Sequence, residues 1–242
     1  MKKTLLSIFI IVALLSSYTC VRASNNLKII YNQSTTPLTQ TMPLPILTSN
    51  WQRIYIKNTG SFDLPPSMEI KKGNYPRYID ETTRIEGFDV KQITAQQKGV
   101  NELSQTAFKR HARVVLETKY DSRNQFEELT FNIFKYTKSY TDELNAVYKD
   151  QITQDLRATS HKLSEWQPVQ LERVNGMSCI HVSYISQLNQ NPKVLVHKYV
   201  FQNSDRVHTL TLSYRLSEAS YWESDFKTIL KSFRINTSRL AD

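Results

Sequence analysis

The sequence predicts a single α+β domain in which a largely antiparallel β-sheet carries helices on both faces, an α/β/α sandwich. The strongest evidence is in residues 177–216, where alternating apolar and polar residues form three segments joined by short polar turns. Two amphipathic stretches, one before these segments and one after them, have apolar residues at spacings of three and four. Both faces of the predicted strands carry apolar side chains, so each face needs a covering layer.

The folded part is expected to span residues 51–236 as one domain. Its first half predicts, in order, a strand over 51–57, a second strand over 61–64, a polar loop over 73–86, a weak strand over 88–95 and a short helix over 102–110. Asn58-Thr59-Gly60 is typical of a turn between the first two strands, and Pro65-Pro66 ends the second strand.

A hairpin and a helix are predicted next. One strand covers residues 113–120, and the returning strand contains Leu129, Phe131 and Ile133. Thr141 is expected to cap the helix, with Asp142 and Glu143 in its first turn. The buried stripe of this helix is Leu144, Val147, Tyr148, Ile152 and Leu156.

The second half of the domain predicts strands over 177–185, 194–201 and 207–216, followed by a helix over 220–233. Ser220 and Glu223 have the spacing of a capping box at the start of that helix. We expect the apolar faces of the three strands to meet each other and the helix, because a one-residue slip would turn a whole face outward. The expected single core contains Ile180, Tyr199, Leu210, Leu212, Trp222, Phe226 and Leu230.

The N-terminus predicts export. Residues 1–23 combine a positive start, an apolar run too short for a stable membrane span, and a small polar end, the layout of a secretory signal peptide. Cleavage after Ala23 gives a periplasmic or secreted protein; the alternative is a lipoprotein signal that leaves Cys20 acylated. Residues 24–50 are rich in Ser, Thr and Pro and predict a flexible linker.

Charge argues against nucleic acid as a partner. The formal charge is +9, but three of the 31 basic residues leave with the signal peptide, so 28 basic and 22 acidic side chains remain. The basic residues are scattered, whereas a nucleic-acid or anionic-lipid surface needs a clustered stripe. The expected partner is an unknown protein or small ligand in the cell envelope, with membrane attachment only if Cys20 is lipidated.

Histidines and Cys179 are the residues to consider for chemistry. Pairing through Ser204-Asp205 places Phe201 opposite His208 and Leu212 opposite His197, so the two histidines lie about 13 Å apart along the sheet. One metal ion cannot bind both, and His181 is expected to point to the other face. Neither a metal nor another cofactor is therefore predicted. Cys179 and His181 share a strand face, which suggests a nucleophile and base as an alternative.

Two loops suggest ligand contacts. Residues 60–66 and 96–101 each place a glycine beside polar side chains that could meet a ligand. The candidate ligand-binding residues in these loops are Asp63, Gln96, Gln97, Lys98 and Asn101. The alternative for both loops is a simple turn between strands.

The element order and the closing segment Ile229-Leu-Lys-Ser-Phe-Arg-Ile235 resemble the PsbP-like α/β/α sandwich, the fold of a photosystem extrinsic subunit and of the Mog nuclear-transport proteins. The resemblance covers most of residues 51–235 in element order and only Leu230-Lys-Ser-Phe233 in residues. It implies a domain that binds partners or ligands and is not an enzyme. The sequence thus predicts an exported, non-enzymatic binding or protein-interaction domain of the bacterial cell envelope; the alternative is a hydrolase or thiol enzyme using Cys179 and His181.

Overall fold

The computed structural model describes residues 50–56, 58–71, 83–85, 88–120, 126, 129 and 138–236. Its main sheet has eight strands and runs β3-β5-β6-β10-β9-β8-β7, with β4 paired to β5, and every pair is antiparallel. The strands are β3 (Met68–Ile70), β4 (Thr83–Ile85), β5 (Phe88–Gln97), β6 (Ala112–Tyr120), β7 (His161–Val174), β8 (Met177–Leu188), β9 (Val194–Asn203) and β10 (Arg206–Arg215). A small sheet joins β1 (Gln52–Ile56), β2 (Gly60–Leu64) and β11 (Arg234–Ile235).

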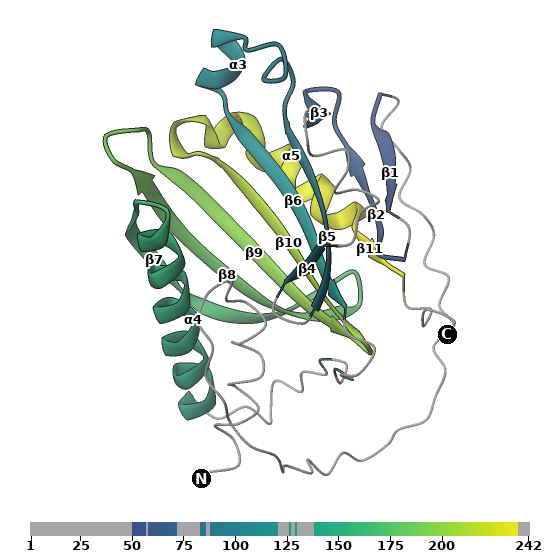
Figure 1. Cartoon of the computed structure of the whole chain (residues 1–242), viewed down its shortest axis with the longest axis vertical. Helices are drawn as coiled ribbons and strands as arrows, with labels where there is room; N and C mark the ends of the chain where they lie inside the picture. The colour runs from purple at the N-terminus through teal and green to yellow at the C-terminus, as the bar shows by residue number, and fades with distance from the viewer. Residues whose placement is uncertain are drawn as a thin grey trace.

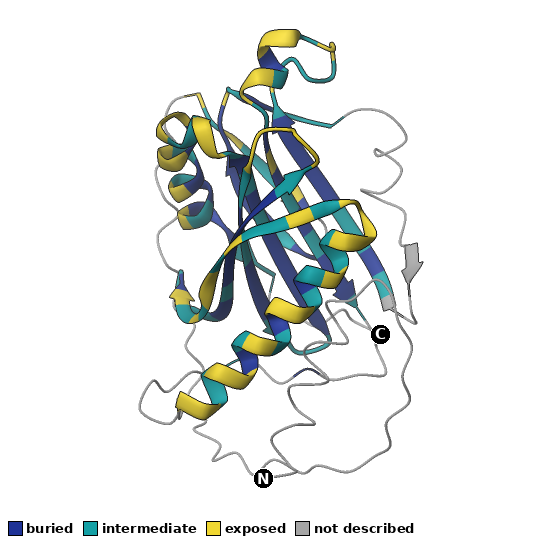
Figure 2. Cartoon of the chain, turned by 90° about the vertical axis from the view of Figure 1, so that its left-hand side faces the viewer, coloured by how far each residue is buried: buried dark blue, intermediate teal, exposed yellow. Residues whose placement is uncertain are grey.

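Helices cover both faces of the main sheet (Figures 1 and 2). In Figure 1, α4 (Lys138–Ala158) lies in front of the sheet and α5 (Ala219–Ser232) passes behind it. The core behind the sheet contains α5 and the small sheet together with β5, β6, β9 and β10. The core in front contains α4 packed on β8, β9 and β10. The predicted fold class, a single α+β domain with an antiparallel sheet between helices, is confirmed.

The two cores correct the predicted single core. Ile180 pairs with Val200 in the sheet, so it faces α4, whereas Tyr199 faces α5. Leu210, Leu212, Trp222 and Phe226 are buried with Tyr199, and Leu230 packs against them, but Ile180 belongs to the other core. The prediction was wrong for Ile180 because β8 is apolar on both faces, and alternation within one strand does not say which face meets which.

The helix starts also differ from the prediction. A 3-10 turn, Leu216–Glu218, leads directly into α5, so Ser220 lies inside the helix. The N-cap residue of α5 is Glu218, whose side chain makes no capping hydrogen bond. The predicted capping box is therefore absent. Helix α4 begins at Lys138, and the Thr141 hydroxyl donates to the Lys138 carbonyl at 2.9 Å from within the first turn. The apolar stripe is as predicted, with Leu144, Tyr148 and Ile152 buried.

Strand β7 is the main element that the sequence did not predict. It pairs with β8 at the end of the sheet, and its register shifts twice, between Leu163 and Glu165 and between Gln167 and Gln170. Each shift interrupts the alternation by which strands are recognised, and Pro168 falls within the second. The predicted short helix is present but shorter, as α3 (Gln105–Lys109) with Ser104 as its N-cap.

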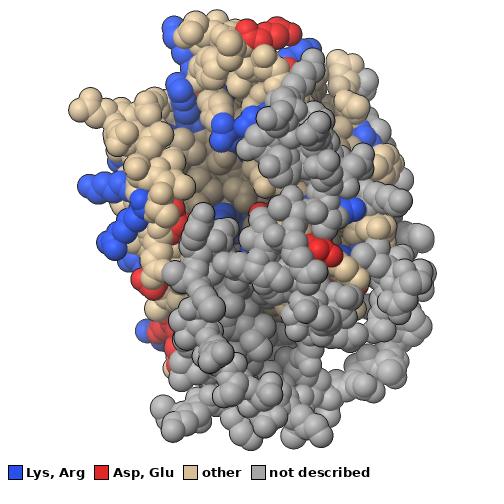
Figure 3. Space-filling view, viewed as in Figure 1, with Lys and Arg blue, Asp and Glu red and all other residues tan. Residues whose placement is uncertain are grey.

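Several predictions lie outside the described residues. These are the signal peptide over 1–23, the linker over 24–49, and the part of the hairpin that contains Phe131 and Ile133. Within the described part of the chain, no helix is long and apolar enough to cross a membrane. On the face that Figure 3 shows, the coloured basic and acidic side chains are interspersed, as expected from their scatter along the sequence.

Candidate functional site

A groove of about 340 Å³ opens between α5 and the sheet face formed by β9 and β10. Alternation along the strands presents every second side chain to it, and α5 adds residues one turn apart. The lining residues are Leu195, His197, Tyr199, Leu212, Tyr214, Glu223, Phe226, Lys227 and Leu230. Most of the wall is therefore aliphatic or aromatic, and Tyr214 meets Phe226 edge to face with ring centroids 5.3 Å apart.

His197 is the histidine that the sheet contributes to this groove, and a hydrogen bond to His181 holds its ring. Its Nδ1 lies 3.0 Å from Nε2 of His181, and Nδ1 of His181 lies 2.7 Å from Oε1 of Glu172. The three residues come from three neighbouring strands, β9, β8 and β7, at diagonal positions on one face. The result is a continuous chain of hydrogen bonds from the edge of the sheet to the groove.

Aromatic packing fixes the middle of this chain. The His181 ring stacks on Tyr199 with centroids 4.3 Å apart and an angle of 11° between the planes. The side chain of His181 is only 12 % exposed, while that of Glu172 is 33 % exposed and in contact with water. We define these three residues, Glu172, His181 and His197, as the relay.

Burial sets the charge state at the groove. The pKa of His197 is lowered to about 4, chiefly by desolvation and also by the neighbouring His181, while the Glu172 carboxylate acts in the opposite direction. His197 is therefore a neutral imidazole at pH 7. Burial also raises the pKa of both tyrosines in the groove, Tyr199 and Tyr214, so each keeps its phenolic proton.

The strand registers show that one prediction about the histidines was wrong and confirm another. His181 was expected to point away from His197, but the register of β8 on β9 puts both on the same face and in contact. The pairing of β9 with β10 is as predicted, with Phe201 opposite His208 and Leu212 opposite His197. His208 is fully buried and its Nδ1 lies 2.9 Å from the Thr118 hydroxyl, away from the relay.

Cys179 lies on the same face of β8 as His181 but in a different environment. The residue is fully buried, and burial raises the pKa of its thiol to about 12, with Glu172 contributing in the same direction. A nucleophilic cysteine needs a lowered pKa and access to its substrate. The geometry therefore gives Cys179 the properties of a core residue.

The relay is not arranged like a metal site. Its members contact one another in series, whereas metal ligands converge on one point at about 2 Å. Among the residues that the structure describes, no group of three His, Cys, Asp or Glu side chains is placed to hold a metal ion.

The structure brings some of the predicted loop residues together. Gln96 donates to Oδ1 of Asn101 at 2.9 Å, and Asn101 Nδ2 donates to the Ile70 carbonyl at 3.0 Å, which ties the turn after β5 to β3. Gln97 donates to the carbonyl of Lys98 at 3.3 Å, and the Lys98 side chain is exposed. A ligand role for these residues stays a prediction.

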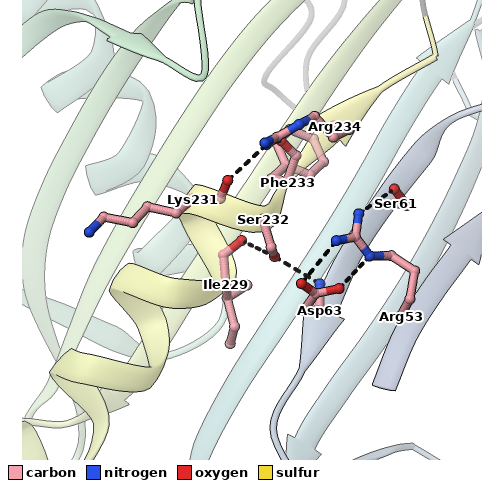
Figure 4. A network of polar contacts seen from close by, with 8 residues as sticks. All are labelled: Arg53, Ser61, Asp63, Ile229, Lys231, Ser232, Phe233 and Arg234. Atoms are coloured by element: carbon pink, nitrogen blue, oxygen red, sulfur yellow. Dashed lines mark hydrogen bonds and ion pairs between the residues drawn. The ribbon is translucent and has the colours of Figure 1, made fainter. Parts of the chain in front are cut away.

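Asp63 lies apart from them in the small sheet. Its side chain is only 5 % exposed and forms an ion pair with Arg53 (Figure 4). It stays a predicted ligand residue as well.

The groove could not be predicted from the sequence, because it depends on how α5 crosses β9 and β10. The signal in the sequence was that Leu195, His197 and Tyr199 are spaced two apart and so share one face of β9.

No family model and no curated protein matches this sequence. Solved structures do resemble the chain. The cyanobacterial PsbP protein of Synechocystis sp. PCC 6803 is 13% identical, with 79% of this chain and 96% of that chain covered and a TM-score of 0.45. A Pseudomonas aeruginosa protein of unknown function is 12% identical, with coverage of 79% and 99% and a TM-score of 0.34.

A Bacteroides thetaiotaomicron protein is 11% identical, with 73% of this chain and 45% of that chain covered and a TM-score of 0.35. The PsbP protein belongs to the group that the sequence itself resembles. At these identities and TM-scores, the alignments carry nothing about function.

Proposed function

We propose that this chain is an exported, non-enzymatic binding domain of the bacterial cell envelope, and that its ligand is a small, largely apolar molecule held in the groove beside α5. One observation carries the proposal: the apolar and aromatic walls of the groove meet a histidine that is itself held by the relay. Ligand sites combine such walls with a few well-placed polar groups. The export part of the proposal rests on the composition of residues 1–23.

The groups around the groove favour binding over catalysis. His197 is neutral at pH 7 because of its lowered pKa, and the hydroxyls of Tyr199 and Tyr214 keep their protons. The Cys179 thiol is buried and protonated, so it offers no nucleophile. The remaining charges, Glu223 and Lys227, form an exposed pair 3.8 Å apart on α5.

Binding of a neutral apolar fluorophore, N-phenyl-1-naphthylamine, tests the proposal. We expect saturable binding to the wild-type protein and its loss in Leu195→Trp, because the indole would fill the groove. The matched control is Val194→Trp, the adjacent position on the same strand, whose side chain packs on the α4 side. This control should bind the probe like the wild type.

Circular dichroism would confirm that both variants are folded. Equal loss of binding in the two variants, or no saturable binding by the wild type, would show that the groove is not a ligand site.

A further inference from the structure

Nε2 of His197 is the ring atom that remains for a ligand in the groove, because Nδ1 is taken by His181. In the described part of the chain, no hydrogen bond involves this Nε2, and it is not among the buried atoms without a partner. A neutral imidazole has one N–H donor and one acceptor nitrogen, and the bond made by one nitrogen decides the role of the other. The role of Nε2 toward a ligand is thus set inside the relay.

When both histidines are neutral and Glu172 is a carboxylate, the relay has one consistent arrangement of protons. The Glu172 carboxylate can only accept, so Nδ1 of His181 donates to it across 2.7 Å. Nε2 of His181 then has no proton and accepts from Nδ1 of His197 across 3.0 Å. Nε2 of His197 consequently presents a lone pair and needs a donor from the ligand.

One added proton reverses this arrangement. A proton taken up at Nε2 of His197 allows the proton on Nδ1 to pass to Nε2 of His181 across their hydrogen bond. His181 is then the imidazolium beside Glu172, and His197 is again neutral but with its proton on Nε2. The lowered pKa of His197 supports this location of the charge, because His197 itself resists protonation.

Building on the proposed ligand groove, we infer that the relay selects ligands by the hydrogen-bond role of the atom that meets His197. With both relay histidines neutral, the ligand must donate, as a phenol or other hydroxyl compound does. With one added proton, His197 donates, and an ether oxygen serves as well as a hydroxyl. Glu172 and His181 are positioning residues in this scheme, since they act through His197.

The other titratable groups around the relay do not compete for this proton. On β8, β9 and β10, the Cys179 thiol and the Tyr199 and Tyr214 phenols have raised pKa values and stay neutral. On α5, Glu223 and Lys227 offset each other as an ion pair at the outer side of the groove. Glu172 on β7 is the charged group that is hydrogen-bonded to the relay histidines.

The test compares 4-propylphenol with 4-propylanisole, which share an apolar body and differ in the hydroxyl proton. Calorimetric titration at pH 8 should show the phenol binding about tenfold more tightly, the effect of one hydrogen bond to a buried acceptor. The ratio should fall toward one as the pH is lowered to 5, with folding checked by circular dichroism at each pH.

Two variants connect this ratio to the relay. His181→Phe keeps a ring on Tyr199 but removes both nitrogens, so the ratio should be near one and independent of pH. Glu172→Gln keeps an acceptor but removes the charge that stabilises the imidazolium, so the change in ratio should move to lower pH. If His181→Phe does not fold, Glu172→Gln decides the question.

The possible failures are distinct. If both probes bind the wild type equally at every pH, or if the ratio changes identically in Glu172→Gln, the relay does not select the ligand, although the groove still binds. If neither probe binds, the proposed ligand site is itself wrong.

Discussion

The backbone N–H of Asp63 donates a hydrogen bond of 2.8 Å to Oγ of Ser232, although 169 positions separate the two residues. The same Ser232 hydroxyl donates to the Ile229 carbonyl at 2.7 Å, and the Asp63 carboxylate pairs with Arg53 through Nε and through the second guanidinium nitrogen at 2.9 Å (Figure 4). These contacts fix the C-terminal end of α5 on the small sheet. They thereby hold the helix that forms one wall of the groove.

Breaking the Arg53–Asp63 pair should destabilise the fold. The two side chains are only 9 % and 5 % exposed, so Asp63→Ala leaves the guanidinium buried without its charge partner and should cost about 3 kcal/mol. The double variant Arg53→Met/Asp63→Leu should lose less than the sum of the single variants. Urea unfolding measures the free energy of unfolding of each variant. The control is Glu165→Gln, which breaks the exposed ion pair with Lys193 and should lower that free energy by less than about 1 kcal/mol. Additive losses would mean that the pair has no coupling energy.

Gly60 is required by a close backbone approach. It has φ +155°, and a Cβ there would lie 2.0 Å from the carbonyl oxygen of Arg234 on the paired strand β11. Gly60→Ala must therefore push β11 away and should cost about 2–3 kcal/mol. Gly176→Ala is the matched control: its φ is +84° but nothing lies within 4 Å, so only backbone strain of about 1 kcal/mol is expected. Equal midpoints of thermal unfolding for the two variants would contradict this account.

Stability should fall with acid because His208 is buried as a neutral ring. Burial lowers its pKa from 6.5 to about 3, so the unfolded chain binds a proton between these pH values that the native protein does not. Stability is thus fully present above pH 6.5 and is lost as the pH falls toward 3, at about 1.4 kcal/mol per pH unit for this one group. His111 and His197, each with a pKa lowered to about 4 by burial, add to the slope below pH 6.5.

The variant His208→Gln identifies the contribution of His208, because glutamine can keep a hydrogen bond to Thr118 without titrating. Free energies of unfolding measured at intervals from pH 7 to pH 4 should show a smaller slope for the variant, by about one proton at the acid end. An unchanged slope would mean that His208 takes up its proton in the folded protein.

Cys179 should resist modification in the folded protein. Its side chain is fully buried and its pKa is raised to about 12, so both access and the reactive thiolate are lacking. A maleimide reagent at pH 7 should label it only when denaturant unfolds the chain. Rapid labelling under native conditions would instead favour the thiol-enzyme alternative that the sequence left open.

Local periodicity accounts for what could be predicted without the structure. The α4 stripe of Leu144, Tyr148 and Ile152 and the fold class follow from apolar spacing within single elements. The register of β9 on β10 was also predictable, because the two-residue turn at Ser204-Asp205 leaves little freedom for slippage. His197 was therefore placed correctly relative to Leu212 and His208.

Strand β8 illustrates what local pattern could not decide. A longer connection joins it to β9, and apolar side chains on both of its faces made either orientation plausible. For this reason the predicted face of Ile180 was wrong. The prediction that His181 and His197 lie on opposite faces was wrong for the same reason. Strand β7 was missed because two register shifts and Pro168 interrupt its alternation, and Glu172 was missed with it.

The sequence by itself determined the antiparallel sheet, the two helices and the apolar stripes that cover it, because spacing within an element fixes which side chains share a face. Only the tertiary structure decided that Glu172, His181 and His197 meet in series beside α5. The contacts among the three residues depend on the registers of three strands, and the Asp63–Ser232 hydrogen bond separately anchors the helix beside them. Pairings between distant segments are selected by the free energy of the whole packed domain, and no single segment of the chain encodes them.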